Sequence, residues 1–204
     1  MNDFPKIQLS PFEEQLVSNS DWLLTKNAIL EKIKGLFSAI ASHQQHLLSA
    51  NGKALPPEVL QTPPKITRGE NYLGLPWLVL DQPRFFDKQD IFAIRTMFWW
   101  GNFFSVTLQL SGIYHDRFLA SINNSYQALR KKDFHIGCSN TQWDHHFGEQ
   151  NYSLISDFDE RSFSRHTGTH PFIKLARRTQ IENGEIPGQG LIDSFKTILE
   201  VFNR

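Results

Sequence analysis

The last third of the chain holds the side chains best suited to chemistry. Carboxylate and imidazole groups are ordinary ligands of zinc and iron. Four such residues predict a metal site and, with it, a metal-dependent hydrolase or oxygenase: Asp144, His146, His166 and His170. His166 and His170 have the four-residue spacing of a helix, but Gly168 and Pro171 predict a turn there. The alternative is that these histidines are ordinary polar residues of loops.

Three arginines suggest a different site, one for a small anionic ligand. A guanidinium group can hold a carboxylate or a phosphate through two parallel hydrogen bonds. If Arg68, Arg95 and Arg177 converge in the fold, they form such a site. The alternative is scattered, solvated charge, since 21% of the residues are charged, slightly under the usual quarter.

Other motifs for catalysis or cofactor binding are missing from the sequence. Cys138 is the only cysteine, and no neighbouring pattern marks it as a nucleophile, so we interpret it as a packing residue. The chain has no G-x-S-x-G sequence and neither of the common glycine-rich phosphate-binding sequences. The sequence therefore names no cofactor.

The pattern that positions Arg95 is the segment Ile91–Ser111. Two runs of β-branched and aromatic residues flank Gly101–Asn102, a pair typical of tight hairpin turns. A two-residue loop pairs Trp99 with Phe104, and every second residue then shares a face. In this register the face that includes Arg95 is otherwise apolar, with Ala93, Met97, Trp99, Phe104, Val106, Leu108 and Leu110.

This register places Arg95 on the core face, where we expect it either to reach the margin of the sheet or to pair with a buried carboxylate such as Glu70 or Asp116. The opposite face is rich in aromatic residues and too apolar for open solvent. Three covers fit it: another part of this chain, a second copy in a homodimer, or a small anionic or aromatic ligand. The hairpin residues predicted to bind such a ligand are Arg95, Trp99, Trp100 and Phe103.

The remaining patterns predict helices packed on a sheet. Ser10, Pro11 and Glu13 have the spacing of a capping box, and a long helix is expected over residues 22–49. Four prolines within residues 54–65 predict an extended connector. The other expected elements are helices over residues 114–132, 157–166 and 190–202 and strands over residues 72–80, 91–100, 103–111, 134–138, 152–155 and 172–181.

These patterns predict the α+β class. We expect a mainly antiparallel sheet of about five or six strands, on which a long N-terminal helix, a middle helix and a C-terminal helix pack. We expect one domain over residues 1–204. Within it, a helical part at residues 10–50 is joined to the rest by the proline-rich connector at 54–65.

The overall composition argues against several classes of partner. The formal net charge is zero, so we do not expect a dedicated nucleic-acid-binding protein. No apolar run reaches the roughly 20 residues that span a bilayer, and no signal-peptide pattern is visible, so we expect a cytoplasmic protein. The predicted function is a binding or self-associating module built on the 91–111 hairpin, with the metal-dependent enzyme as the alternative.

Overall fold

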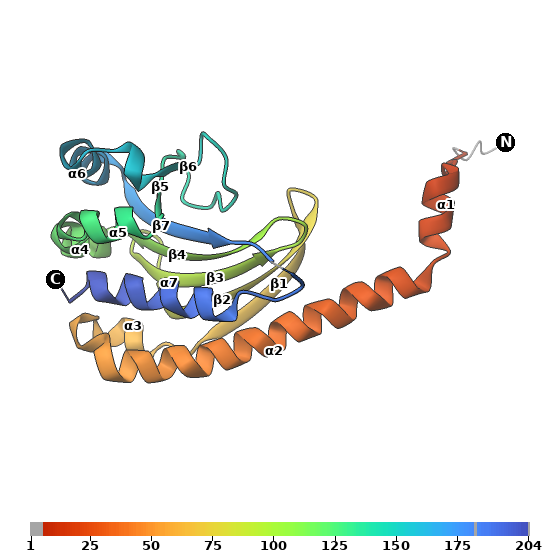
Figure 1. Ribbon diagram of the computed structural model, residues 1–204, viewed down its shortest axis with the longest axis horizontal. Helices are drawn as coiled ribbons and strands as arrows, with labels where there is room; N and C mark the ends of the chain where they lie inside the picture. Colours follow the sequence, from red (N-terminus) through yellow and green to blue (C-terminus); the bar gives the residue numbers. More distant parts are fainter. Residues whose placement is uncertain (1–5, 182, 204) are drawn as a thin grey trace.

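The computed structural model describes residues 6–181 and 183–203 and shows an α+β fold, as predicted (Figure 1). Within these residues, seven strands form one antiparallel sheet in the order β1-β2-β3-β4-β7-β5-β6, more strands than the five or six predicted. The strands are β1 (Lys65–Tyr72), β2 (Leu75–Phe86), β3 (Ile91–Trp99), β4 (Phe103–Ser111), β5 (His135–Gly137), β6 (Tyr152–Leu154) and β7 (Phe172–Thr179).

Helices lie at both ends of the described chain. The Glu13 backbone N–H donates to the Ser10 hydroxyl and the Ser10 N–H donates to the Glu13 carboxylate, which confirms the capping box. The helices are α1 (Pro11–Val17), α2 (Ser20–Asn51), α3 (Pro57–Gln61), α4 (Ile113–Asn124), α5 (Tyr126–Lys131), α6 (Glu160–Thr169) and α7 (Gly188–Val201), with single turns η1 (Gly52–Ala54) and η2 (Ile155–Asp157). Among the described residues, no helix has both the length and the apolar character needed to cross a membrane.

The main hydrophobic core lies between one face of the sheet, here called the helix face, and the helices α2, α4 and α7 (Figure 1). Phe37 of α2 packs edge-on against Phe104 of β4, with ring centroids 6.4 Å apart. Phe92 of β3 contacts Phe202, which follows α7, at 5.3 Å and Tyr114 of α4 at 5.8 Å. Aromatic rings from three helices therefore fix the helix face of the central strands.

The predicted hairpin is present, but its register differs by one residue. Trp99 pairs with Phe103, so three residues rather than two form the loop. Gly101, whose φ is +73°, is the third residue of a turn that the Asn102 N–H closes by donating to the Trp99 carbonyl. A two-residue loop would have needed this glycine in second place. Trp99 and Phe104 consequently point to opposite faces.

The shift exchanges the residues of β4 between the two faces of the sheet. The helix face takes Phe92, Ile94, Phe98, Phe104, Val106, Leu108 and Leu110. The prediction that Arg95 shares a face with the last four of these residues is wrong. Arg95 instead shares the opposite face, here called the polar face, with Thr107, Gln109 and the apolar cluster of Met97, Trp99 and Phe103.

The proline-rich segment at residues 54–65 is not extended throughout, as the sequence had predicted. Pro57 is the first residue of α3, a position at which a helix needs no backbone N–H. The following strand, β1, was not predicted at all. The strand expected to end at Leu80 continues to Phe86, since a bulge between Asp81 and Arg84 takes the intervening proline out of the ladder.

The turn predicted around His166 and His170 is also wrong. Helix α6 continues through Gly168 to Thr169, and its last turn keeps the hydrogen bond from the His170 N–H to the His166 carbonyl. The two imidazole rings therefore stack, with centroids 5.0 Å apart. One glycine lowers helix stability by only about 1 kcal/mol, which is too little to end a helix that packs on α4.

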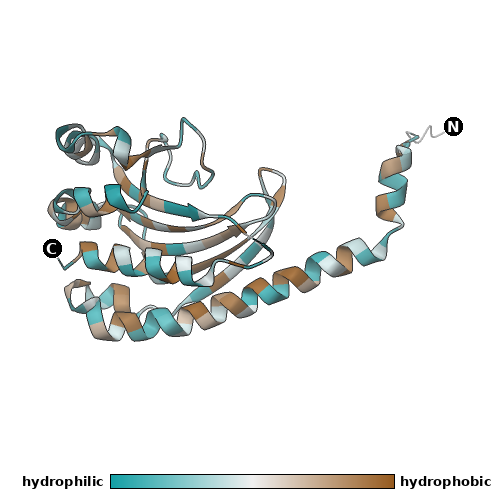
Figure 2. Cartoon of the chain, in the orientation of Figure 1, coloured by the Kyte–Doolittle hydropathy of each residue, from teal (hydrophilic) through white to brown (hydrophobic). Residues whose placement is uncertain are grey.

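The N-terminal helices leave the rest of the protein as a helical arm (Figure 1). We define the arm as residues 7–28 and the body as the described residues that follow. No residue of α1 is buried, and the first buried side chain of α2 is Leu30. Hydrophobic residues nevertheless continue along α2 beyond the sheet and into α1 (Figure 2).

Candidate binding surfaces

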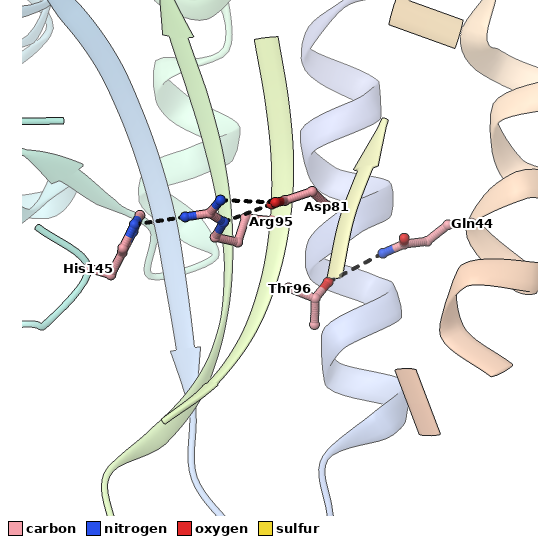
Figure 3. A network of polar contacts seen from close by, with 5 residues as sticks. All are labelled: Gln44, Asp81, Arg95, Thr96 and His145. Atoms are coloured by element: carbon pink, nitrogen blue, oxygen red, sulfur yellow. Dashed lines mark hydrogen bonds and ion pairs between the residues drawn. The ribbon is translucent and has the colours of Figure 1, made fainter. Parts of the chain in front are cut away.

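The polar face of the sheet carries a buried network of charged groups (Figure 3). Arg95 of β3 lies opposite Asp81 of β2 in the ladder. Its guanidinium donates to both carboxylate oxygens, from Nε to Oδ1 at 2.7 Å and from Nη2 to Oδ2 at 2.9 Å. Nη1 donates to Nε2 of His145 at 2.9 Å. We call Asp81, Arg95, His145 and Lys174 the polar network.

His145 accepts the hydrogen bond from Arg95 because its ring is neutral. Burial, together with the positive charges of Lys174 and Arg95, holds the pKa of His145 well below its ordinary value. The expected partners of Arg95 lie elsewhere, since Glu70 pairs with Lys26 and Asp116 contacts His115. Asp81 was not among the expected partners, because it lies just beyond the predicted end of its strand at Leu80.

Lys174 of β7 is the most deeply buried cation of the network, with 1% of its surface exposed. Its Nζ donates to the backbone carbonyl of Asp144 and lies 5.0 Å from the centre of the Tyr152 ring. Burial, reinforced by Arg95 and opposed by Asp144, lowers the pKa of Lys174 to about 7. Gly137 of β5 lets the two strands approach, because a Cβ there would stand 2.9 Å from the Cβ of Lys174.

Residues 138–151, here called the covering loop, close over the polar face. Gln142 accepts a hydrogen bond from Gln109 of β4 at 3.1 Å, and Phe147 packs edge-on against Phe103 at 5.0 Å. The Tyr72 hydroxyl accepts hydrogen bonds from the backbone N–H groups of His145 and His146. This part of the chain therefore covers the polar face, and the polar network anchors it to the sheet. The face predicted to need a cover does not exist as such, because the register shift leaves Phe92 and Phe98 under the helices but Phe103, Thr107 and Gln109 beneath the covering loop.

The three arginines of the predicted anion site do not converge. Arg177 lies opposite Val106 in the ladder and so points to the helix face, where it reaches the Ser194 hydroxyl at 3.4 Å. Arg68 also points to the helix face, near Glu31 of α2, but from the edge strand β1. Arg95 points to the polar face. Arg68 and Arg177 thus share a face but lie four strands apart, about 19 Å at the usual strand spacing. Arg95 lies on the opposite face of the sheet from both.

The aromatic residues predicted to bind a ligand surround the tip of the hairpin. Trp99 and Phe103 pack together on the polar face at 5.5 Å, and the Trp99 indole donates to the Tyr72 carbonyl at 3.1 Å. These two residues also line a hollow of about 290 Å³ at the tip, which Ile181 borders. Trp100 points the other way and meets Trp22 of the arm edge-on at 6.3 Å.

The predicted metal ligands all form hydrogen bonds with other residues of the chain. Nε2 of His166 donates to the Gly137 carbonyl at 2.8 Å, and Nε2 of His170 donates to the Ser139 carbonyl at 3.0 Å. Asp144 and His146, further along the covering loop, contact Ser139 and Tyr72 respectively. Within the part of the chain that the structure describes, no group of three or more His, Cys, Asp or Glu side chains is placed to hold a metal ion.

The arm carries the most apolar exposed surface of the described chain. Thirteen large hydrophobic residues are exposed among the described residues, and eight of them precede residue 25: Ile7, Leu9, Phe12, Leu16, Val17, Trp22, Leu23 and Leu24. Patches of this extent are rare on monomers and mark interaction surfaces. The sequence analysis missed this surface because a pattern of apolar residues does not tell whether anything covers them.

Comparisons with protein-family models, with curated protein sequences and with solved structures found no match for this chain.

Proposed function

We propose that this protein is a non-catalytic binding module that associates with a second copy of itself through its helical arm. The observation that carries the proposal is the concentration of exposed apolar side chains on residues 7–24, far above that on the body. The hairpin contributes to this surface only through Trp100, which touches Trp22. We therefore propose that the chain self-associates, as predicted, but through the arm and not through the hairpin.

The charges of the arm favour a protein as the partner. Residues 7–28 contain three acidic side chains, those of Glu13, Glu14 and Asp21, and one basic side chain, that of Lys26, which pairs with Glu70 of the body. Nucleic acids and anionic membrane surfaces attract lysine and arginine and repel carboxylates. An apolar, acidic helix fits a protein surface better than either of them.

The size of the exposed surface also fits a specific interface. Together the eight exposed side chains offer apolar surface on the order of several hundred Å², the extent at which patches on a monomer mark interaction sites. A two-fold symmetric pair uses the same patch on both copies, so one surface on one chain is sufficient.

The test is the mass of the full chain in solution. Sedimentation equilibrium between about 1 and 100 μM should give twice the chain mass of 23.6 kDa. The double variant Leu23→Ser with Leu24→Ser should sediment as a monomer, while Ile113→Ser, which changes an exposed body residue, should remain dimeric. A wild-type chain that is monomeric over the whole range would refute the proposal.

A further inference from the structure

We propose that two copies pair through antiparallel α2 helices, so that Leu24 of each copy enters a groove beside Ala41 of the other. This inference rests on the proposed self-association and specifies its geometry. It is carried by the residue pattern of α2, by a hollow on the body and by the charges between them.

One face of α2 carries a continuous stripe that borders its buried face and shares only Ala41 with it. The stripe follows the alternating three- and four-residue spacing of helices that pack lengthwise. Its members are Leu24, Asn27, Glu31, Lys34, Ser38, Ala41 and Gln45. All except Ala41 are exposed, so this face of α2 is available over about six turns.

The C-terminal part of the stripe borders a hollow of about 570 Å³, here called the α2 groove. Its lining comes from α2, from β1 and the proline that precedes it, and from β2: Ser38, Ala41, Ser42, Gln45, Pro64, Ile66 and Gln82. The Ser38 hydroxyl donates to the Lys34 carbonyl at 3.0 Å, and the Ser42 hydroxyl donates to the Ser38 carbonyl at 3.2 Å. A leucine side chain that enters the groove therefore leaves neither hydroxyl without a hydrogen bond.

The arm and the groove are complementary at the two ends of the same stripe. Leu24 and Ala41 are 17 positions apart, about 26 Å along the helix. A two-fold axis midway between them places each Leu24 against the partner's Ala41, a large residue against a small one. The same axis brings Asn27 opposite the partner's Ser38.

The charges at the centre of the stripe favour an antiparallel over a parallel arrangement of the two α2 helices. In this register Glu31 lies opposite the partner's Lys34, and symmetry repeats the pair. Within one chain Glu31 already contacts Lys34 at 3.4 Å and Arg68 at 3.8 Å. The side chains of Glu31 and Lys34 are nevertheless more than half exposed, at 59% and 54%, and so can also reach a partner. A parallel pairing in register would instead set each residue against its own copy and so oppose like charges.

Disulfide trapping tests this register in the full chain, with Cys138→Ser as the background. Under mild oxidation, the variant carrying Leu24→Cys and Ala41→Cys should form a covalent dimer. The matched variant carrying Leu24→Cys and Ser49→Cys should not, because Ser49 lies on the same helix face but about 12 Å beyond Ala41. A chain that sediments as a dimer but is not trapped through Leu24 and Ala41 would overturn this geometry and leave the self-association standing.

Charge reversal tests the same register without cysteines. Glu31→Lys alone should weaken the dimer by at least about fivefold, since two lysines then face each other twice. The combined variant Glu31→Lys with Lys34→Glu should restore the dimer to within about twofold of the wild-type dissociation constant. If the combined variant is no better than the single one, these two residues do not face each other across the interface.

Discussion

The body and the arm of this protein differ in which side chains they bury and which they expose. The body buries charges, and it provides Arg95 with a carboxylate and a neutral imidazole and Lys174 with a carbonyl and an aromatic ring. The arm leaves eight large hydrophobic side chains in solvent. Burying a lysine with hydrogen-bond partners is harder than burying a leucine, and this fold does the former. The exposure of the apolar residues of the arm is therefore better explained by a partner that covers them than by poor packing.

The free energy of burying apolar side chains also favours a partner for the arm. Burial of one leucine or phenylalanine side chain contributes about 1.5–3 kcal/mol, whereas a whole domain is stable by only about 5–15 kcal/mol. The arm of a single chain forgoes several such contributions. Association with a second copy would recover part of this free energy, which in our proposal drives the pairing.

The largest expected difference in unfolding free energy is between a substitution in the buried part of α2 and one in the arm. We expect Phe37→Ala, in the buried part of α2, to lower the free energy of unfolding by about 3–5 kcal/mol. Leu24→Ala, in the arm, should change it by no more than about 0.5 kcal/mol. Denaturant unfolding at a protein concentration low enough to keep the chain monomeric measures both values. Equal losses would mean that the arm packs within a single chain.

A somewhat smaller effect should come from the ion pair of the polar network. Asp81→Asn leaves the Arg95 guanidinium buried without its carboxylate, so we expect a loss of about 3 kcal/mol in unfolding free energy. Glu70→Gln removes the acidic partner of Lys26 near the arm, where the Glu70 side chain is exposed, and should cost less than about 1 kcal/mol. The comparison becomes sharper if both variants keep the wild-type circular dichroism spectrum.

The smallest effect is the pH dependence that Lys174 confers on the body. The pKa of Lys174 is lowered to about 7 in the folded protein, so between pH 7 and its ordinary pKa the unfolded chain binds more protons and stability rises with pH. From pH 7 to pH 9 the gain should be about 2 kcal/mol. Lys174→Met should remove that gain, and an unchanged slope in this variant would assign the pH dependence to other groups.

The sequence predicted most helices and strands correctly, but it did not predict which residues of a strand lie on which face of the sheet. The hairpin over residues 91–111 follows from its β-branched and aromatic runs, and the capping box at Ser10 follows from spacing. The register did not follow, because the same Gly101 fits a loop of two residues or of three, and one position decides which face Arg95 occupies.

The parts of the candidate surfaces that the sequence could not supply depend on contacts between distant segments. Asp81 lies opposite Arg95 because β2 continues past the predicted strand end at Leu80, and the bulge that carries the strand on to Phe86 comes only after this pair. The arm is visible only once the length of α2 is compared with the width of the sheet beneath it (Figure 1). Both features are properties of the assembled fold rather than of any one segment.

Hydrogen exchange at two protein concentrations tests the proposed pairing most directly, because it reports both association and its location. If two copies pair along α2, the backbone amides of residues 20–28 should become more protected as the concentration of the full chain rises. Those of β4, which lies within the body, should stay the same. Arm amides that exchange rapidly and equally at every concentration would contradict the pairing of two copies through α2.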